Sequence, residues 1–167
     1  MSNLKIKLKG IVVEDFINYK YPSMFLIAPS CNFKCCVENG LDTTVCQNQS
    51  LVNQLTKEFD IKNIIDRYLS NDITKAVVFG GLEPLDNPSY TAEVIDFIEM
   101  FRQYSDDSII IYTGYYKNEI KTVINELKRY KNIIVKFGRY VPNHKPHYDE
   151  ILGVNLASGN QYAERIS

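Results

Sequence analysis

Several features that mark whole classes of protein are missing from this chain of 167 residues. No apolar run approaches the roughly 20 residues that a membrane helix needs. The start, Met-Ser-Asn-Leu-Lys, is not followed by the apolar stretch of a secretory signal peptide. The 19 basic and 20 acidic residues nearly cancel, so no overall field attracts nucleic acid or an anionic membrane. We therefore expect a soluble, cytoplasmic protein with no nucleic-acid and no membrane partner.

The chain also lacks internal repeats, low-complexity tracts and a convincing linker. Its hydrophobic share of 45% and aromatic share of 12% are those of an ordinary globular protein. A chain of this length can bury a substantial core. We predict one domain over residues 1–167.

Cysteine is scarce, but its placement is informative. Cys31, Cys35, Cys36 and Cys46 are the only cysteines, and they directly follow the apolar run Met24–Ala28. Such a group is a disulfide staple, a structural zinc site or an iron–sulfur site. A staple is disfavoured because disulfides are rare in reducing compartments. A structural zinc ion usually takes two Cys-x-x-Cys pairs, and these spacings differ from that pattern.

Adjacent Cys35 and Cys36 cannot easily point at one metal centre, so the natural count is three thiolate ligands and a spare thiol. Three thiolates with one open position are typical of a working metal site, and soft thiolates suit iron–sulfur clusters. We predict the chemistry in the loop over residues 31–48. The pair His144 and His147 is predicted to lie in a solvated loop rather than at a second metal site.

Hydrophobic periodicity predicts alternating strands and helices. Strands are expected at 4–8, 11–16, 24–28, 76–79, 109–112 and 133–135, and helices at 50–59, 61–69, 88–101 and 120–127. Asp60 and Asn87 are the expected N-caps of two of these helices.

The short, continuously apolar strands indicate a parallel sheet that is buried on both faces. The cysteine loop, Gly80-Gly81, Thr113-Gly114 and Gly138-Arg139 each follow such a strand, so these loops share one sheet edge. Open parallel sheets and barrels bind ligands at that edge. Because a full eight-unit barrel takes about 250 residues, the predicted fold is α/β, a partial (open) parallel β/α barrel with extra N-terminal strands.

The cysteine loop resembles the cluster motif of the radical S-adenosylmethionine (SAM) enzymes, and most closely that of the activating proteins of anaerobic ribonucleoside-triphosphate reductases. That motif is Cys-x3-Cys-x2-Cys followed by x-Asn. Cys31-Asn-Phe-Lys-Cys35 and Cys46-Gln-Asn48 match its two ends, whereas residues 36–45 stand where the family has two residues.

A second segment, Gly80-Gly81-Leu82-Glu83-Pro84, resembles the family's Gly-Gly-Glu-Pro segment with Leu82 inserted. Weaker echoes of the family are Asp15–Asn18, Tyr112–Tyr115 and Ala157–Gln161.

The resemblance implies a fold of the radical SAM type and a 4Fe–4S cluster held by Cys31, Cys35 and Cys46, with Cys36 spare. It also implies that SAM is the second cofactor. The residues implied in SAM binding are Gly80, Gly81, Glu83, Pro84, Val45, Asn48 and Thr113. Asn48 is an equally good candidate for a helix cap. Arg139 is expected in a surface salt bridge, or at a carboxylate of SAM or of the partner.

The activity implied is that of a radical SAM oxidoreductase, which cleaves SAM reductively to a 5′-deoxyadenosyl radical. In the family this radical creates a glycyl radical on the large subunit of an anaerobic ribonucleotide reductase, with flavodoxin or ferredoxin as a typical electron donor. Two alternatives stay open. One is a radical SAM enzyme that acts on another protein or a small molecule, and the other is a non-catalytic zinc or iron–sulfur binding module.

Overall fold

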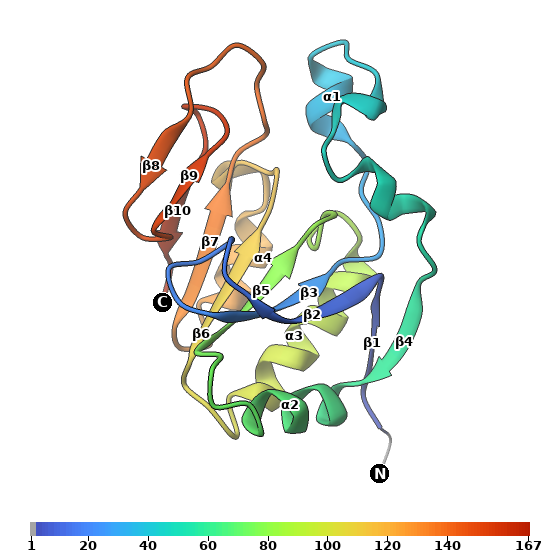
Figure 1. Ribbon diagram of the computed structural model, residues 1–167, viewed down its shortest axis with the longest axis vertical. Coiled ribbons are helices and arrows are strands. Elements are labelled where there is room, and N and C mark those ends of the chain that lie inside the picture. The colour runs from blue at the N-terminus through green and yellow to red at the C-terminus, as the bar shows by residue number, and fades with distance from the viewer. Residues whose placement is uncertain (1–2) are drawn as a thin grey trace.

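The computed structural model describes residues 3–167 as a mixed α/β structure built on a six-stranded sheet (Figure 1). The strand order is β10-β7-β6-β5-β3-β2, so the sheet is open and has free edges at β10 and β2. Its strands are β2 (Gly10–Asp15), β3 (Ser23–Ile27), β5 (Ala76–Gly80), β6 (Ser108–Tyr112), β7 (Ile133–Phe137) and β10 (Tyr162–Arg165).

Two small antiparallel pairs lie outside this sheet. They are β1 (Lys5–Leu8) with β4 (Lys57–Asp60), and β8 (His147–Asp149) with β9 (Val154–Leu156). The helices are α1 (Lys34–Glu38), α2 (Ile61–Leu69), α3 (Pro88–Phe101) and α4 (Lys121–Leu127), and the short 3-10 helices are η1 (Thr43–Val45), η2 (Gln49–Asn53) and η3 (Lys117–Glu119). Within residues 3–167 no helix has the length and apolar character needed to cross a bilayer.

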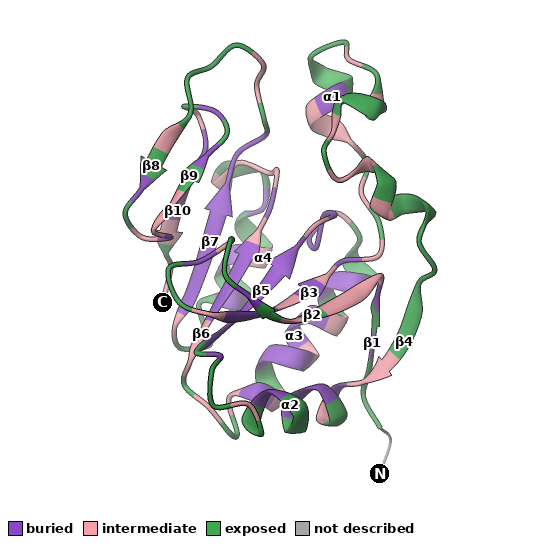
Figure 2. Cartoon of the chain, in the orientation of Figure 1, coloured by how far each residue is buried: buried purple, intermediate pink, exposed green. Residues whose placement is uncertain are grey.

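The four central strands β3, β5, β6 and β7 are parallel, as their sequence pattern predicts, whereas β2 and β10 pair antiparallel with their neighbours. Every residue of β5 and β7 is buried, which is visible in Figure 2. One face of the sheet packs on α2, α3 and α4 through residues such as Phe79, Ile111 and Val135. The other face packs on Leu152 and Leu156 of the β8–β9 region. A sheet covered on both faces explains the continuous apolar runs.

The predicted helix starts at Asp60 and Asn87 are confirmed. The Asp60 carboxylate accepts a hydrogen bond from the backbone N–H of Lys62 at 2.9 Å, and the Asn87 side chain accepts one from Ser89 at 2.9 Å. Pro88 occupies the first turn of α3, where its missing N–H costs no helical hydrogen bond. Local capping chemistry therefore fixes where both helices begin.

The predicted helix over 50–59 is wrong. Residues 49–53 form only η2, and the segment then extends into β4, where Phe59 lies opposite Ile6 of β1. Leu55 is 73% exposed, so a helix here has no continuous apolar face to bury. Pairing with β1 satisfies the backbone of both segments instead.

Two further differences concern the C-terminal part. His147 belongs to strand β8, and its Nε2 lies 2.6 Å from the carbonyl oxygen of Gln161, so the solvated-loop prediction is right only for the exposed His144. Strand β10 was not predicted, and it covers the free edge of β7.

The carboxyl ends of the parallel strands meet at one edge of the sheet. Ile27 of β3 pairs in register with Gly80 of β5, and Tyr112 of β6 pairs with Lys136 of β7. Helix α1 lies beyond this edge in Figure 1. The loops that carry the predicted site residues are therefore neighbours in space.

Candidate functional site

Two of the predicted ligand cysteines line a small cavity at this sheet edge. Cys31 follows β3 and Cys35 lies in α1, and both border a cavity of about 30 Å³ together with Glu83. The rest of the lining comes from Asn32, Lys34, Gly114, Tyr115 and Arg139. Residues from the β3, β5, β6 and β7 loops thus converge on two thiols and one carboxylate.

The third predicted ligand is not in this cavity. Cys46 follows η1 and is partly buried, while Cys36 is only 4% exposed, and all four thiols are free. Across residues 3–167, no three His, Cys, Asp or Glu side chains are grouped closely enough to hold a metal ion. Four neighbouring thiols fit an iron–sulfur cluster by their chemistry. Three-point attachment requires three of these thiols to come closer together than they lie here.

Burial controls the protonation of these thiols. It raises the pKa of Cys31 to about 12, although the backbone N–H of Phe33 donates a hydrogen bond to the Sγ atom at 3.3 Å. Burial and the neighbouring Cys35 thiol raise the pKa of Cys36 to about 11, and Cys46 is near enough to influence it as well. Both groups are therefore thiols at neutral pH, and metal binding has to release their protons.

Glu83 is held rigidly against the cavity. Its Oε1 accepts hydrogen bonds from the hydroxyl of Thr113 at 2.8 Å and from the N–H of Leu85 at 3.0 Å, and its Oε2 accepts one from the N–H of Gly114 at 2.7 Å. Burial raises the pKa of Glu83, and these three donors oppose that shift. A carboxylate has about four acceptor sites, so one remains for a cationic ligand group. The predicted residue Thr113 reaches the site through this contact.

The sequence reasoning did not identify Lys136, which lies in β7 and is only 7% exposed. Its Nζ donates a hydrogen bond to the carbonyl of Gly138 at 3.1 Å. Burial lowers the pKa of Lys136 to about 8, while the negative charge of Glu83 acts in the opposite direction. The signal was the single charge in the run Ile-Ile-Val-Lys-Phe, since a lysine in a doubly buried strand needs a partner.

The two glycines that precede Glu83 are required by the chain itself. Gly81 has φ +77°, and a Cβ there would lie 2.9 Å from Cγ2 of Ile27. A Cβ on Gly80 would lie 3.2 Å from the Phe25 ring. The inserted Leu82 packs in the core, so the insertion leaves Glu83 at the cavity. Pro84 is buried beside it in the same loop but does not line the cavity.

Of the predicted SAM contacts only Glu83 lines the cavity, and Gly80, Gly81, Val45 and Asn48 lie outside it as well. Val45 is 53% exposed. Asn48 stands at the start of η2, and its side chain makes no capping hydrogen bond. Both belong to the same half of the loop as Cys46, the half that is separate from the cavity.

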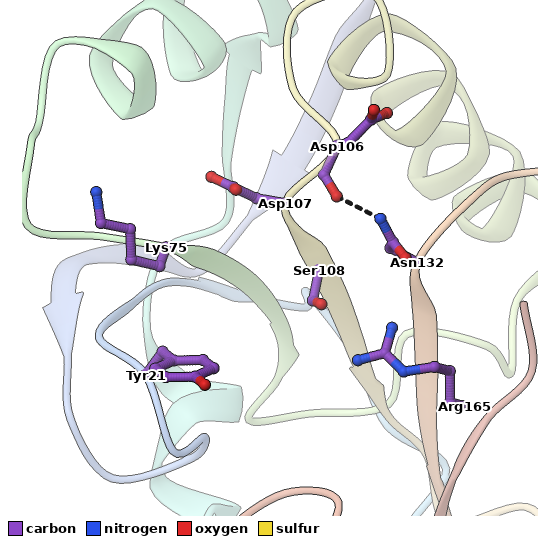
Figure 3. Close-up of a pocket in the computed structure, with 7 residues that line it drawn as sticks. All are labelled: Tyr21, Lys75, Asp106, Asp107, Ser108, Asn132 and Arg165. Atoms are coloured by element: carbon purple, nitrogen blue, oxygen red, sulfur yellow. Dashed lines mark hydrogen bonds between the residues drawn. The ribbon is translucent and has the colours of Figure 1, made fainter.

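A larger hollow lies at the opposite edge of the sheet (Figure 3). It measures about 490 Å³ and is lined by Tyr21, Lys75, Asp106, Asp107, Ser108, Asn132 and Arg165. Part of its polar lining is already paired, because Asn132 donates to the carbonyl of Asp106 at 2.6 Å and Tyr68 donates to Asp107 at 2.6 Å. No cysteine and no predicted site residue borders it, so size alone does not locate the site.

A family model described as a 4Fe-4S single cluster domain matches residues 23–157. The match includes the cysteine loop and the four parallel strands. No curated protein and no solved structure gives a significant match to the chain.

Proposed function

The chain belongs to the 4Fe-4S single cluster domain family and is an iron–sulfur protein, and from this premise we propose that it is a radical SAM enzyme. The observation that carries the proposal is the position of Glu83. Its buried carboxylate borders the same cavity as Cys31 and Cys35, as a group that receives the SAM ammonium beside a cluster must. A purely structural metal site has no use for such a carboxylate.

The chain's own residues have separate tasks in this proposal. Cys31, Cys35 and Cys46 are the cluster ligands. Glu83 accepts a charge-assisted hydrogen bond from the methionine ammonium, and Thr113 fixes the orientation of its carboxylate. When bound, a 4Fe–4S cluster with an open coordination site supplies the electron that splits the carbon–sulfur bond of SAM.

Buried charge also has to be balanced at the site. Lys136 is a buried cation that interacts electrostatically with Glu83 and Cys35, and it offsets part of the negative charge that the carboxylate and the thiolates introduce. Without a cation nearby, each buried negative group favours its neutral form. Lys136 therefore helps to keep Glu83 ionised, which it must be in order to bind an ammonium group.

For the radical acceptor we propose a glycine of the large subunit of an anaerobic ribonucleotide reductase, with a flavodoxin or ferredoxin as electron donor. The resemblance of Cys31–Cys35, Cys46–Asn48 and Gly80–Pro84 to the activating proteins supports this. We also propose that the open six-stranded sheet corresponds to the partial β/α barrel of these enzymes. Another protein or a small molecule as acceptor requires the same cofactor site.

Electron paramagnetic resonance tests the proposal. The protein is reconstituted anaerobically with iron and sulfide, reduced with dithionite and measured with and without SAM, alongside an assay for 5′-deoxyadenosine. We expect a reduced 4Fe–4S signal that changes when SAM is added, and 5′-deoxyadenosine as a product. A cluster signal that ignores SAM, or tight zinc without iron, contradicts the radical SAM assignment.

A further inference from the structure

Arg139 follows β7 and is the most highly connected side chain at the cavity. Its Nε donates to the Glu38 carboxylate at 2.5 Å, and its Nη1 donates to Glu119 at 2.7 Å and to the carbonyl of Gly114 at 3.3 Å. The guanidinium also lies over the Tyr116 ring, 4.6 Å from its centre. The Arg139 side chain is 8% exposed, whereas Glu38 is 42% exposed and Glu119 is 25% exposed, so these ion pairs are shielded from water on the arginine side only.

The helix at the far end of this network has few other attachments. Helix α1 contains a single buried residue, Cys36, and Val37 is 67% exposed. A second ion pair reinforces the first, because Lys34 of α1 lies 3.1 Å from Glu119 and 4.0 Å from Glu38. Ion pairs therefore attach α1 to the sheet edge, whereas buried apolar side chains attach α2 and α3 to the sheet.

The position of Cys35 depends on this attachment. Cys35 is in the same short helix as Glu38, whereas Cys31 directly follows the chain leaving core strand β3. Glu119 belongs to η3, which is built after β6. Through Arg139, a helix that bears two thiols, Cys35 and Cys36, is joined to two loops of the sheet edge.

We propose that Arg139 is a positioning residue, which clamps α1 to the sheet edge and so holds Cys35 beside Cys31 for cluster binding. The inference deepens the proposed cluster site and rests on it. An arginine suits the task because its planar fork donates to several acceptors at fixed angles, which a lysine ammonium cannot reproduce. Two cations, Lys34 and Arg139, face two anions, Glu38 and Glu119, so the clamp is electrically balanced.

The test compares Arg139→Gln with the wild-type protein in two ways. In the metal-free protein, a thiol reagent and peptide mass spectrometry give the labelling rate of each cysteine under native conditions. We expect Cys35 and Cys36 to react faster in the variant, while Cys31 keeps its rate. A merely destabilised fold would expose Cys31 as well, so Cys31 is an internal reference in the same molecule.

In the reconstituted protein, iron loss to a chelator is the second measurement. We expect it to be about 10-fold faster in Arg139→Gln, as for other residues that orient a metal ligand. Arg139→Lys keeps the positive charge but loses the planar guanidinium. We expect it to restore less than half of the difference in iron-loss rate between the wild type and Arg139→Gln. Lys7→Gln, which removes a remote ion pair with Glu93, serves as the control and should change neither rate.

Two results overturn the inference. One is an unchanged Cys35 labelling rate in Arg139→Gln, and the other is full rescue by Arg139→Lys. The proposed function fails if the wild-type protein takes up no cluster. The role of Arg139 is tested independently of this, because thiol labelling needs no cluster.

Discussion

At the level of single residues, Glu83 joins the functional loops through one carboxylate. It accepts hydrogen bonds from Thr113 and Gly114 after β6, and its own N–H donates to the carbonyl of Ser30 at 2.9 Å. Its position therefore depends on the loops after three neighbouring strands. A substitution at Glu83 therefore bears on both folding and ligand binding, and experiments can separate these two effects.

Glu83→Gln should leave cluster incorporation intact and weaken SAM binding. The amide keeps the shape of the side chain but removes the charge-assisted bond to the ammonium, for which we expect about 10-fold lower affinity. Titration of the reduced cluster signal with SAM measures this. Glu93→Gln, at an ion pair remote from the cavity, is the matched control. Equal affinity in the wild type and Glu83→Gln would assign ammonium binding to another group.

Serine substitutions test the ligand assignment. Cys31→Ser, Cys35→Ser and Cys46→Ser should each abolish incorporation of the 4Fe–4S cluster, because a three-thiolate site cannot spare a ligand. Cys36→Ser should retain it. The measurement is iron and acid-labile sulfide per chain after reconstitution. Loss of the cluster in Cys36→Ser together with its retention in Cys46→Ser would exchange these two cysteines in the assignment.

Glu119 makes the clamp depend on pH in a predictable direction. Its bond to Arg139 lowers the pKa of Glu119 from 4.5 to about 2. A carboxyl group whose pKa is lowered by folding stabilises the fold fully above its ordinary pKa, and this contribution is lost as the pH falls through the folded value. In urea unfolding of the metal-free protein, the difference between wild type and Glu119→Gln should be constant above pH 4.5. It should shrink between pH 4.5 and 2. A difference that grows on acidification contradicts this account.

At the level of elements, the turn that follows β5 sets where Glu83 lies. Gly81 combines a φ of +77° with a close approach to Ile27, whereas Gly40, after α1, has a φ of +63° and open space around it. Both glycines therefore have a positive φ, but only at Gly81 would a Cβ overlap with a neighbouring side chain. Their alanine variants separate backbone strain from steric overlap.

Gly81→Ala should lower the free energy of unfolding by about 2 to 4 kcal/mol, since strain and overlap add. Gly40→Ala should cost only about 1 kcal/mol, because the strained φ is its single penalty. Urea unfolding of both metal-free variants gives the comparison. Equal losses would mean that the 2.9 Å contact with Ile27 relaxes freely.

Elements that follow from local chemistry were predictable from the sequence. The apolar runs identified the four parallel strands, and Asp60 and Asn87 identified helix starts, because burial on both faces and capping leave a direct trace in the sequence. Strand β4 was missed because its pairing with β1 joins residues that are far apart in the chain, such as Ile6 and Phe59. A local pattern cannot report a distant partner.

The same reasoning applies to the site. Spacing and resemblance gave Cys31, Cys35 and Glu83, which the fold brings to one cavity. The partnership of Arg139 with Glu38 and Glu119 was not foreseeable, because it joins segments that follow different strands. The separation of Cys46 from the cavity likewise depends on how the loop packs, which its sequence does not encode locally.

At the level of the whole molecule, stability is distributed unevenly between sheet and cysteine loop. Strands β5 and β7 are buried throughout, whereas the loop from α1 to β4 exposes Val37, Val45 and Leu55 at 67%, 53% and 73%. In Figure 2 this loop is mostly green and pink. A loop with so little apolar burial is held by its charge pairs and, when a cluster is bound, by metal–thiolate bonds. Cluster binding and ordering of this loop are then linked equilibria.

Hydrogen exchange should resolve this linkage along the chain. In the metal-free protein, amides of residues 77–79 and 133–135 should exchange only through global unfolding, and amides of residues 34–56 through local opening that is far less costly. Reconstitution should slow exchange over residues 34–46. The β5 amides should still exchange with the free energy of global unfolding. The reason is that a ligand bound to the loop stabilises only the states in which the loop is closed. Uniform slowing of all amides would mean that loop and sheet unfold as one unit. If the loop amides exchange as slowly as those of β5 before metal is added, the cysteine loop is already fixed without its cluster.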